Sequence, residues 1–195
     1  MTEPAPSMRS HGRPSTHVPP DGLYETTQHY VGDLVYGAND GILTTFAVVA
    51  GVTGGALSAA TVIVVGMANL VADGLSMGVG NYLGIRTRES ALERQGQPQE
   101  EAQPARHGLA TFLAFVVAGS VPLVPYLIPG AGDDFTPAAC LTFGALFGVG
   151  AARSLVTASR WWVSGLEMLG LGVLVAVVAY ATGAVIALFI QNGAG

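Results

Sequence analysis

The sequence predicts an all-α polytopic membrane protein in which five transmembrane helices form one bundle. Half of its 195 residues are hydrophobic and only 11% are charged, and the mean hydropathy is +0.49. The runs Leu109–Leu127 and Leu166–Ile190 are long enough to cross a hydrocarbon core of about 30 Å at about 1.5 Å per residue. The arginines gather in three places outside the apolar runs, which is typical of a polytopic protein.

The first expected span covers about 31–55 and is the least apolar, because it carries Asp33, Asn39 and Asp40. An Asn-Asp-Gly word forms a tight turn in soluble proteins. A turn here would leave only Ile42–Ala50, which is too short to cross a membrane. It would also separate the N-terminal arginines from the others, so the charge asymmetry favours a complete span.

The other expected spans are about 57–84, 108–128, 137–157 and 165–191. The second continues into a charged helical extension, and the rest of the predicted cytoplasmic loop 86–107 carries two prolines. Three further prolines bend or end the third span at its far surface. The fourth holds the single cysteine, and the fifth follows Trp161 and Trp162, an interfacial aromatic pair.

Residues 1–30 are rich in proline and have no apolar core, so they are predicted to be a disordered cytoplasmic tail and not a signal peptide. With five spans, every arginine falls on one face of the membrane. By the positive-inside tendency, that face and the N-terminus are cytoplasmic, and the C-terminus lies on the opposite side. No basic run with interleaved aromatic residues indicates a nucleic-acid partner.

Two aspartates, Asp40 and Asp73, stand inside expected spans. A carboxylate at the centre of a bilayer costs at least about 2.5–3.5 kcal/mol, so each indicates a functional site. Asn69, Asp73 and Met77 recur every four residues and share one stripe of a helix. Because the first two spans run in opposite directions, counting helical rises places Asp40 at a depth between Asp73 and Met77.

Glycines four residues apart flank both acids, and small residues at this spacing let helices approach closely. The sequence therefore predicts that spans one and two pack closely around the acids through the glycines Gly37, Gly41, Gly74 and Gly78.

Carboxylate and amide oxygens suit hard divalent ions, and a thioether sulfur adds a preference for a softer ion such as Fe²⁺. No histidine lies within an expected span, which argues against a structural zinc site. Carboxylates also bind protons, so metal and proton would compete for Asp40 and Asp73 and could exchange. The expected partners are a divalent transition-metal ion, protons and membrane lipid, with no permanently bound cofactor.

Glu89 and Glu93 are candidates for cytoplasmic metal capture, although a solvated mixed-charge loop explains them more simply.

Asp33–Gly41, Ala68–Gly78, Asn81–Leu83 and Ser164–Leu169 resemble the vacuolar iron transporter family over roughly residues 29–191. This resemblance implies a five-helix homodimer with an ion path at the dimer interface. It also implies export of Fe²⁺, often also Mn²⁺, from the cytosol in exchange for protons. Asp40 and Met77 match transport residues of the family.

The chain departs from the plant members of that family in two places. Its loop 86–107 is short, as in the nodulin-like branch, and lacks the long Glu-rich cytoplasmic domain. A position that is glutamate in plant members is Asn69 here, while Asp73 stands one turn further along. These departures leave cytoplasmic metal capture and ion selectivity open.

Two rivals to a transporter remain open from the residues. An intramembrane aspartyl enzyme would need Asp40 and Asp73 close enough to share one proton. A scaffold would use both acids as structural partners of Arg153 or Arg160. The sequence as a whole favours a proton-coupled exporter with Asp40, Asp73, Met77 and Asn69 at its metal site and no enzymatic activity.

Overall fold

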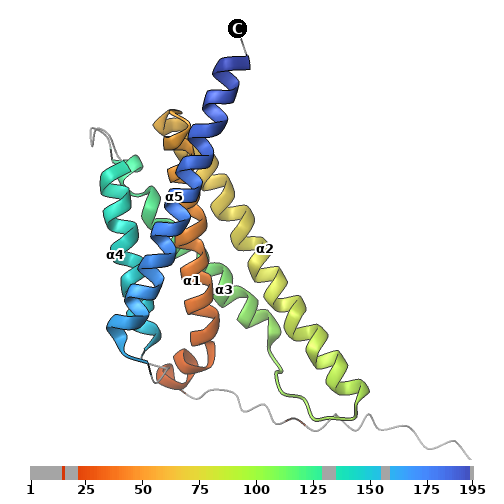
Figure 1. Ribbon diagram of the computed structural model, residues 1–195. Coiled ribbons are helices and arrows are strands. Elements are labelled where there is room, and N and C mark those ends of the chain that lie inside the picture. Colours follow the sequence, from red (N-terminus) through yellow and green to blue (C-terminus); the bar gives the residue numbers. More distant parts are fainter. Residues whose placement is uncertain (1–14, 16–21, 129–134, 155–158, 194–195) are drawn as a thin grey trace, which may run out of the picture.

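The computed structural model describes residues 15, 22–128, 135–154 and 159–193 of the chain (Figure 1). These residues form α1 (Leu23–Gly54), α2 (Ala59–Arg94), α3 (Pro104–Gly119), α4 (Phe135–Arg153) and α5 (Trp161–Gly193). Two short 3₁₀ turns, Val121–Leu123 and Pro125–Leu127, follow α3. Five helices are long and apolar enough to cross a membrane, which confirms the prediction of an all-α protein with five membrane helices.

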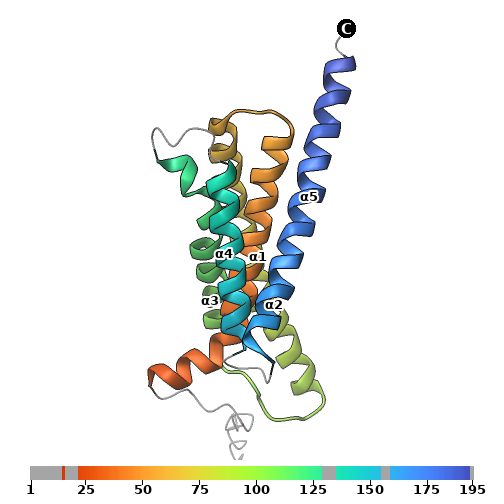
Figure 2. The same cartoon turned by 60° about the vertical axis from the view of Figure 1, so that its left-hand side comes forward.

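The helices extend beyond the expected spans where polar residues continue them. α1 begins at Leu23 rather than near residue 31, so residues 23–30, expected in the tail, are helical. These first turns are directed away from the axis of the rest of α1 (Figure 2). Residues 1–14 and 16–21 of the expected tail, with Arg9, Arg13 and two histidines, lie outside the described residues.

The connection between α2 and α3 begins with the helical extension of α2 that the sequence predicted. α2 continues through its charged segment to Arg94, and α3 already begins at Pro104. Proline is well suited to the first position of a helix, because it has no amide proton to leave unpaired there. The connection is therefore residues 95–103, and His107 lies inside α3.

Proline also ends α3 at its other end. Pro122 and Pro125 each lack the amide proton that an α-helix needs, and the chain continues past Ser120 as two 3₁₀ turns. Leu123 is fully buried there and packs with Phe46, Leu70 and Phe115 in the main apolar core. This core ties the end of α3 to α1 and α2.

α3 lies between α1 and α2, which diverge toward the α2–α3 loop (Figure 1). A Cβ on Gly37 or Gly41 of α1 would meet the α3 backbone at Thr111 or Phe115. One on Gly78 of α2 would meet the α3 backbone at Gly108. The glycines that flank the two acids therefore pack against α3, and α1 and α2 also contact each other directly.

α4 and α5 complete the bundle. α5 packs on α4 near its start, where Gly150 of α4 adjoins Ser164 and Met168. Further along, Gly183 of α5 approaches the backbone of Gly51 in α1. The rest of α5 is largely exposed and apolar, as expected for a helix that faces lipid.

Candidate functional site

Asp40 of α1 and Asp73 of α2 are both half-buried and lie close enough for the charge of one to act on the other. Among the described residues, neither carboxylate has a hydrogen bond or an ion pair. Arg153, considered above as a structural partner, lies instead 3.9 Å from Glu167 of α5. Two like charges without a cation are costly inside a membrane, so this pair is a candidate cation site.

Other oxygen atoms lie beside Asp40. The side-chain oxygen of Asn39 is buried and has no hydrogen-bond partner among the described residues. Thr44 Oγ1 donates to the backbone carbonyl of Asp40 at 2.8 Å, so this hydroxyl braces the helix and leaves the Asp40 carboxylate unbound. Asn69 is half-buried one turn from Asp73 on α2, and no hydrogen bond of its side chain is seen in the described part.

Met77 lies one turn beyond Asp73 and is partly buried against the core. It also lines a groove of about 450 Å³ between α1 and α2, together with Tyr36, Asn81 and Arg88. Tyr36 is 63% exposed. The thioether of Met77 is therefore accessible from an open surface that runs along α2 toward Arg88.

The two candidate glutamates for metal capture differ in their surroundings. Glu89 is buried, and its Oε1 accepts hydrogen bonds from the amides of Glu100 (3.1 Å) and Glu101 (2.8 Å). Its carboxylate holds the α2–α3 loop against α2. Glu93 is exposed near the end of α2.

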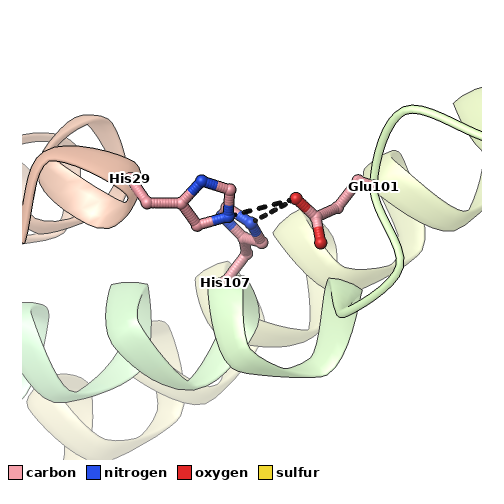
Figure 3. Close-up of side chains that lie close together, drawn as sticks. All are labelled: His29, Glu101 and His107. Carbon is pink, nitrogen blue, oxygen red and sulfur yellow. Dashed lines mark hydrogen bonds and ion pairs between the residues drawn. The ribbon is translucent and has the colours of Figure 1, made fainter. Parts of the chain in front are cut away.

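A second polar cluster was not expected from the sequence. His29 of α1, Glu101 of the loop and His107 of α3 offer ligand atoms that all lie within 4.8 Å of one another (Figure 3). Hydropathy had placed both histidines outside the spans, and the structure places them in the first turns of α1 and α3. The sequence feature that could have indicated this cluster is Asp33, because an acid inside a span needs a partner.

Asp33 is held by partners from two other helices. His107 Nδ1 lies 2.5 Å from Asp33 Oδ2. Asn81 Nδ2 of α2 donates to Asp33 Oδ1 at 2.7 Å and to Thr111 Oγ1 at 2.8 Å. Asp33 is thus the centre of a hydrogen-bonded network that connects α1, α2 and α3.

Comparison with known proteins identifies the family. The VIT family model matches residues 31–102 and 90–184. Vacuolar iron transporter 1 of Arabidopsis thaliana is 24% identical over 226 residues, which cover 84% of this chain and 90% of that protein. Vacuolar iron transporter 1 of Oryza sativa subsp. japonica is 22% identical over 238 residues, covering 92% of each. A vacuolar iron transporter of Toxoplasma gondii is 43% identical over 75 residues, or 38% of this chain and 25% of that protein.

Proposed function

The chain belongs to the VIT family, and from that premise we propose that it is a membrane transporter that carries Fe²⁺ or Mn²⁺ out of the cytoplasm in exchange for protons. The relatives in Arabidopsis thaliana and Oryza sativa are named vacuolar iron transporters. This chain aligns with nearly the whole length of each of them. Five helices able to span a membrane and a family match across most of them support a multi-pass integral membrane protein.

The observation that carries the proposal is the pair Asp40 and Asp73. Two carboxylates that act on each other's charge, with no partner seen among the described residues, suit a divalent cation that replaces its water with protein oxygens. Met77 stands one turn from Asp73 and adds the sulfur that favours Fe²⁺ over Mg²⁺ and Ca²⁺. Asn69, one turn to the other side of Asp73, supplies an amide oxygen.

Proton exchange follows from the same groups. A carboxylate releases its metal when it is protonated, so an acidic far side of the membrane would drive unloading. The histidine-containing cluster at the α2–α3 end of the bundle is not required for this step. The arginine distribution supports a cytoplasmic location for that end of the bundle. If the chain is bacterial, the plasma membrane is its expected location.

A homodimer would complete the ion path. The groove beside Met77 is open in a single chain, with Tyr36 exposed on its α1 wall. A second copy that covers this face would enclose the groove between two pairs of α1 and α2. This assembly would also cover the exposed ring of Tyr36.

Transport by the purified full chain in proteoliposomes tests the proposal. With an acidic lumen, the protein should take up Fe²⁺, and Asp40→Asn should abolish uptake while the variant stays folded by size-exclusion chromatography. Glu167→Gln is the matched control, because it removes an exposed carboxylate of α5 outside the site. Full transport by Asp40→Asn would contradict the assignment.

The rival functions give different results in the same preparation. If the protein is a scaffold that needs the acids for structure, Asp73→Ala should reduce the amount of folded protein. The wild-type scaffold would show no transport in the same assay. An aspartyl enzyme would keep one proton shared between Asp40 and Asp73, so metal addition would release no protons from the wild-type protein beyond those released from Asp40→Asn. The transporter predicts that metal releases more protons from the wild-type protein than from Asp40→Asn.

A further inference from the structure

His29, Glu101 and His107 converge on one point from three separate parts of the chain (Figure 3). His107 Nε2 lies 3.0 Å from Glu101 Oε2, and His29 Nε2 lies 3.2 Å from the same oxygen. Ligands bound at about 2.1 Å around one ion are about 3.0–3.4 Å apart. Two of the three spacings in the cluster already match that arrangement.

The hydrogen bond on the other side of the His107 ring favours a cation in the cluster. When Nδ1 donates its proton to Asp33, the Nε2 atom of a neutral ring presents a lone pair. That lone pair faces the Glu101 carboxylate, which also only accepts. A positive charge between the two resolves this repulsion, either as a second proton on the imidazole or as a metal ion.

The surroundings of His107 resemble the support that metal-bound histidines receive. A ligating histidine almost always donates its second ring proton to a carboxylate or carbonyl, which fixes the ring and raises its basicity. Asp33 provides this carboxylate and is itself fixed by Asn81. Tyr30 is buried with its ring centroid 4.7 Å from that of His107, so an apolar surface covers one side.

The cluster also has access from outside. A cavity of about 290 Å³ is lined by Glu101 and His107, with Arg88, Glu89 and Glu100 around it. This volume holds several water molecules, each of about 30 Å³. An ion held by three protein ligands would therefore have room to keep water in its remaining coordination positions.

We propose that His29, Glu101 and His107 form a binding site for a divalent transition-metal ion, separate from the Asp40 and Asp73 site. Two imidazoles and one carboxylate suit Fe²⁺, Zn²⁺ or Co²⁺ and not Mg²⁺ or Ca²⁺. Asp33 precedes Asp40 by seven residues, or about 10 Å along α1 at about 1.5 Å per residue. A bound ion would fasten the α2–α3 loop to the first turns of α1.

Metal binding by the full chain in detergent tests this proposal. The parent for all measurements carries His11→Ala and His17→Ala, which removes the other two of the four histidines. Equilibrium dialysis against Zn²⁺, and Co²⁺ absorption as a reporter of imidazole ligands, should show one fewer bound ion in His29→Ala and in Glu101→Gln. Asp33→Asn should retain the ion with an affinity about 10–100-fold weaker.

Other variants separate this site from the transport site. Asp40→Asn should leave the Co²⁺ spectrum unchanged even where it abolishes transport, so failure of one proposal does not imply failure of the other. His29 and Glu101 are partly exposed and are changed in preference to the buried His107. A Zn²⁺-induced rise in the melting temperature of the parent, absent in His29→Ala, is the second readout. Equal Zn²⁺ stoichiometry and affinity in the parent, His29→Ala and Glu101→Gln would overturn the proposal and favour a doubly protonated His107.

Discussion

Asp33 of α1 and His107 of α3 are joined by a hydrogen bond of 2.5 Å, although they lie 74 residues apart in the sequence. Asn81 of α2 occupies the other oxygen of the same carboxylate at 2.7 Å. One acid thus connects three helices at the end of the bundle where α1 and α2 diverge. Because lipid offers no hydrogen bonds, side-chain bonds of this kind help to hold membrane helices together.

Replacing Asn81 should therefore destabilise the fold. Asn81→Ala leaves Asp33 Oδ1 without its donor, and we expect a loss of about 1–2 kcal/mol in the free energy of unfolding. Asn69→Ala is the matched control, since no hydrogen bond of the Asn69 side chain is seen in the described residues. Thermal unfolding in detergent measures both, and equal melting temperatures for the two variants would contradict the structural role of the network.

Close approach of α1 to α3 makes a second prediction. A methyl group on Gly41 would meet the backbone of Phe115, which cannot rotate away, so Gly41→Ala should force α1 and α3 apart. We expect a lower melting temperature and a broadened size-exclusion peak. Gly144→Ala in α4 has nothing within 4 Å of the new methyl group and should be neutral or stabilising by up to about 1 kcal/mol. A Gly41→Ala variant as stable as Gly144→Ala would refute tight packing here.

The number and order of the helices follow from hydropathy because lipid leaves a spanning chain few structural choices. The first turns of α1 and α3 do not follow, since Gln28–Val31 and Pro104–His107 are polar or mixed and still helical. Hydropathy measures where a helix enters the membrane and not where its hydrogen bonding stops. For the same reason, the spans expected from hydropathy placed His107 in a loop.

The two acids in the spans could be identified from the sequence because a charge in hydrocarbon has a known cost. Their neighbours could not, because periodicity shows the face of a helix that a residue occupies and not the helix it meets. Gly41 and Gly78 both contact α3, and His29 meets Glu101 only because the first turns of α1 approach the α2–α3 loop. Such contacts depend on the packing of the whole bundle.

Charge repulsion between Asp40 and Asp73 leads to a prediction with opposite signs for two measurements. Asp73→Asn removes one of two like charges, so the metal-free protein should melt at a higher temperature. The same change removes a ligand, so the rise in melting temperature on adding Fe²⁺ or Mn²⁺ should shrink. For the wild type, a hundredfold excess over Kd stabilises by about 2.7 kcal/mol. A lower metal-free melting temperature with an unchanged metal effect would contradict a role for Asp73 at the site.

The loop between α2 and α3 should open when Glu89 is removed. Glu89→Ala leaves the amides of Glu100 and Glu101 without their acceptor, and trypsin should then cleave after Arg94 faster than in the wild type. Glu93→Ala removes an exposed carboxylate from the same helix and should not change the cleavage rate. If Glu89 and Glu93 instead act together in metal capture, both variants would weaken metal uptake without a difference in cleavage.

A change at Met77 tests how ligand type affects ion selectivity, because it leaves the charge of the site unchanged. Met77→Leu keeps the volume and apolar character of the side chain, so the fold should lose less than about 1.5 kcal/mol. It removes the only sulfur on the stripe with Asn69 and Asp73, and sulfur prefers Fe²⁺ over Mg²⁺ and Ca²⁺. In proteoliposomes we expect slower Fe²⁺ uptake and stronger inhibition by Mg²⁺. Met67→Leu, an exposed methionine earlier on α2, is the control. If Mg²⁺ inhibits Fe²⁺ uptake equally in Met77→Leu and the wild type, the sulfur has no role in selectivity and the oxygen ligands determine it.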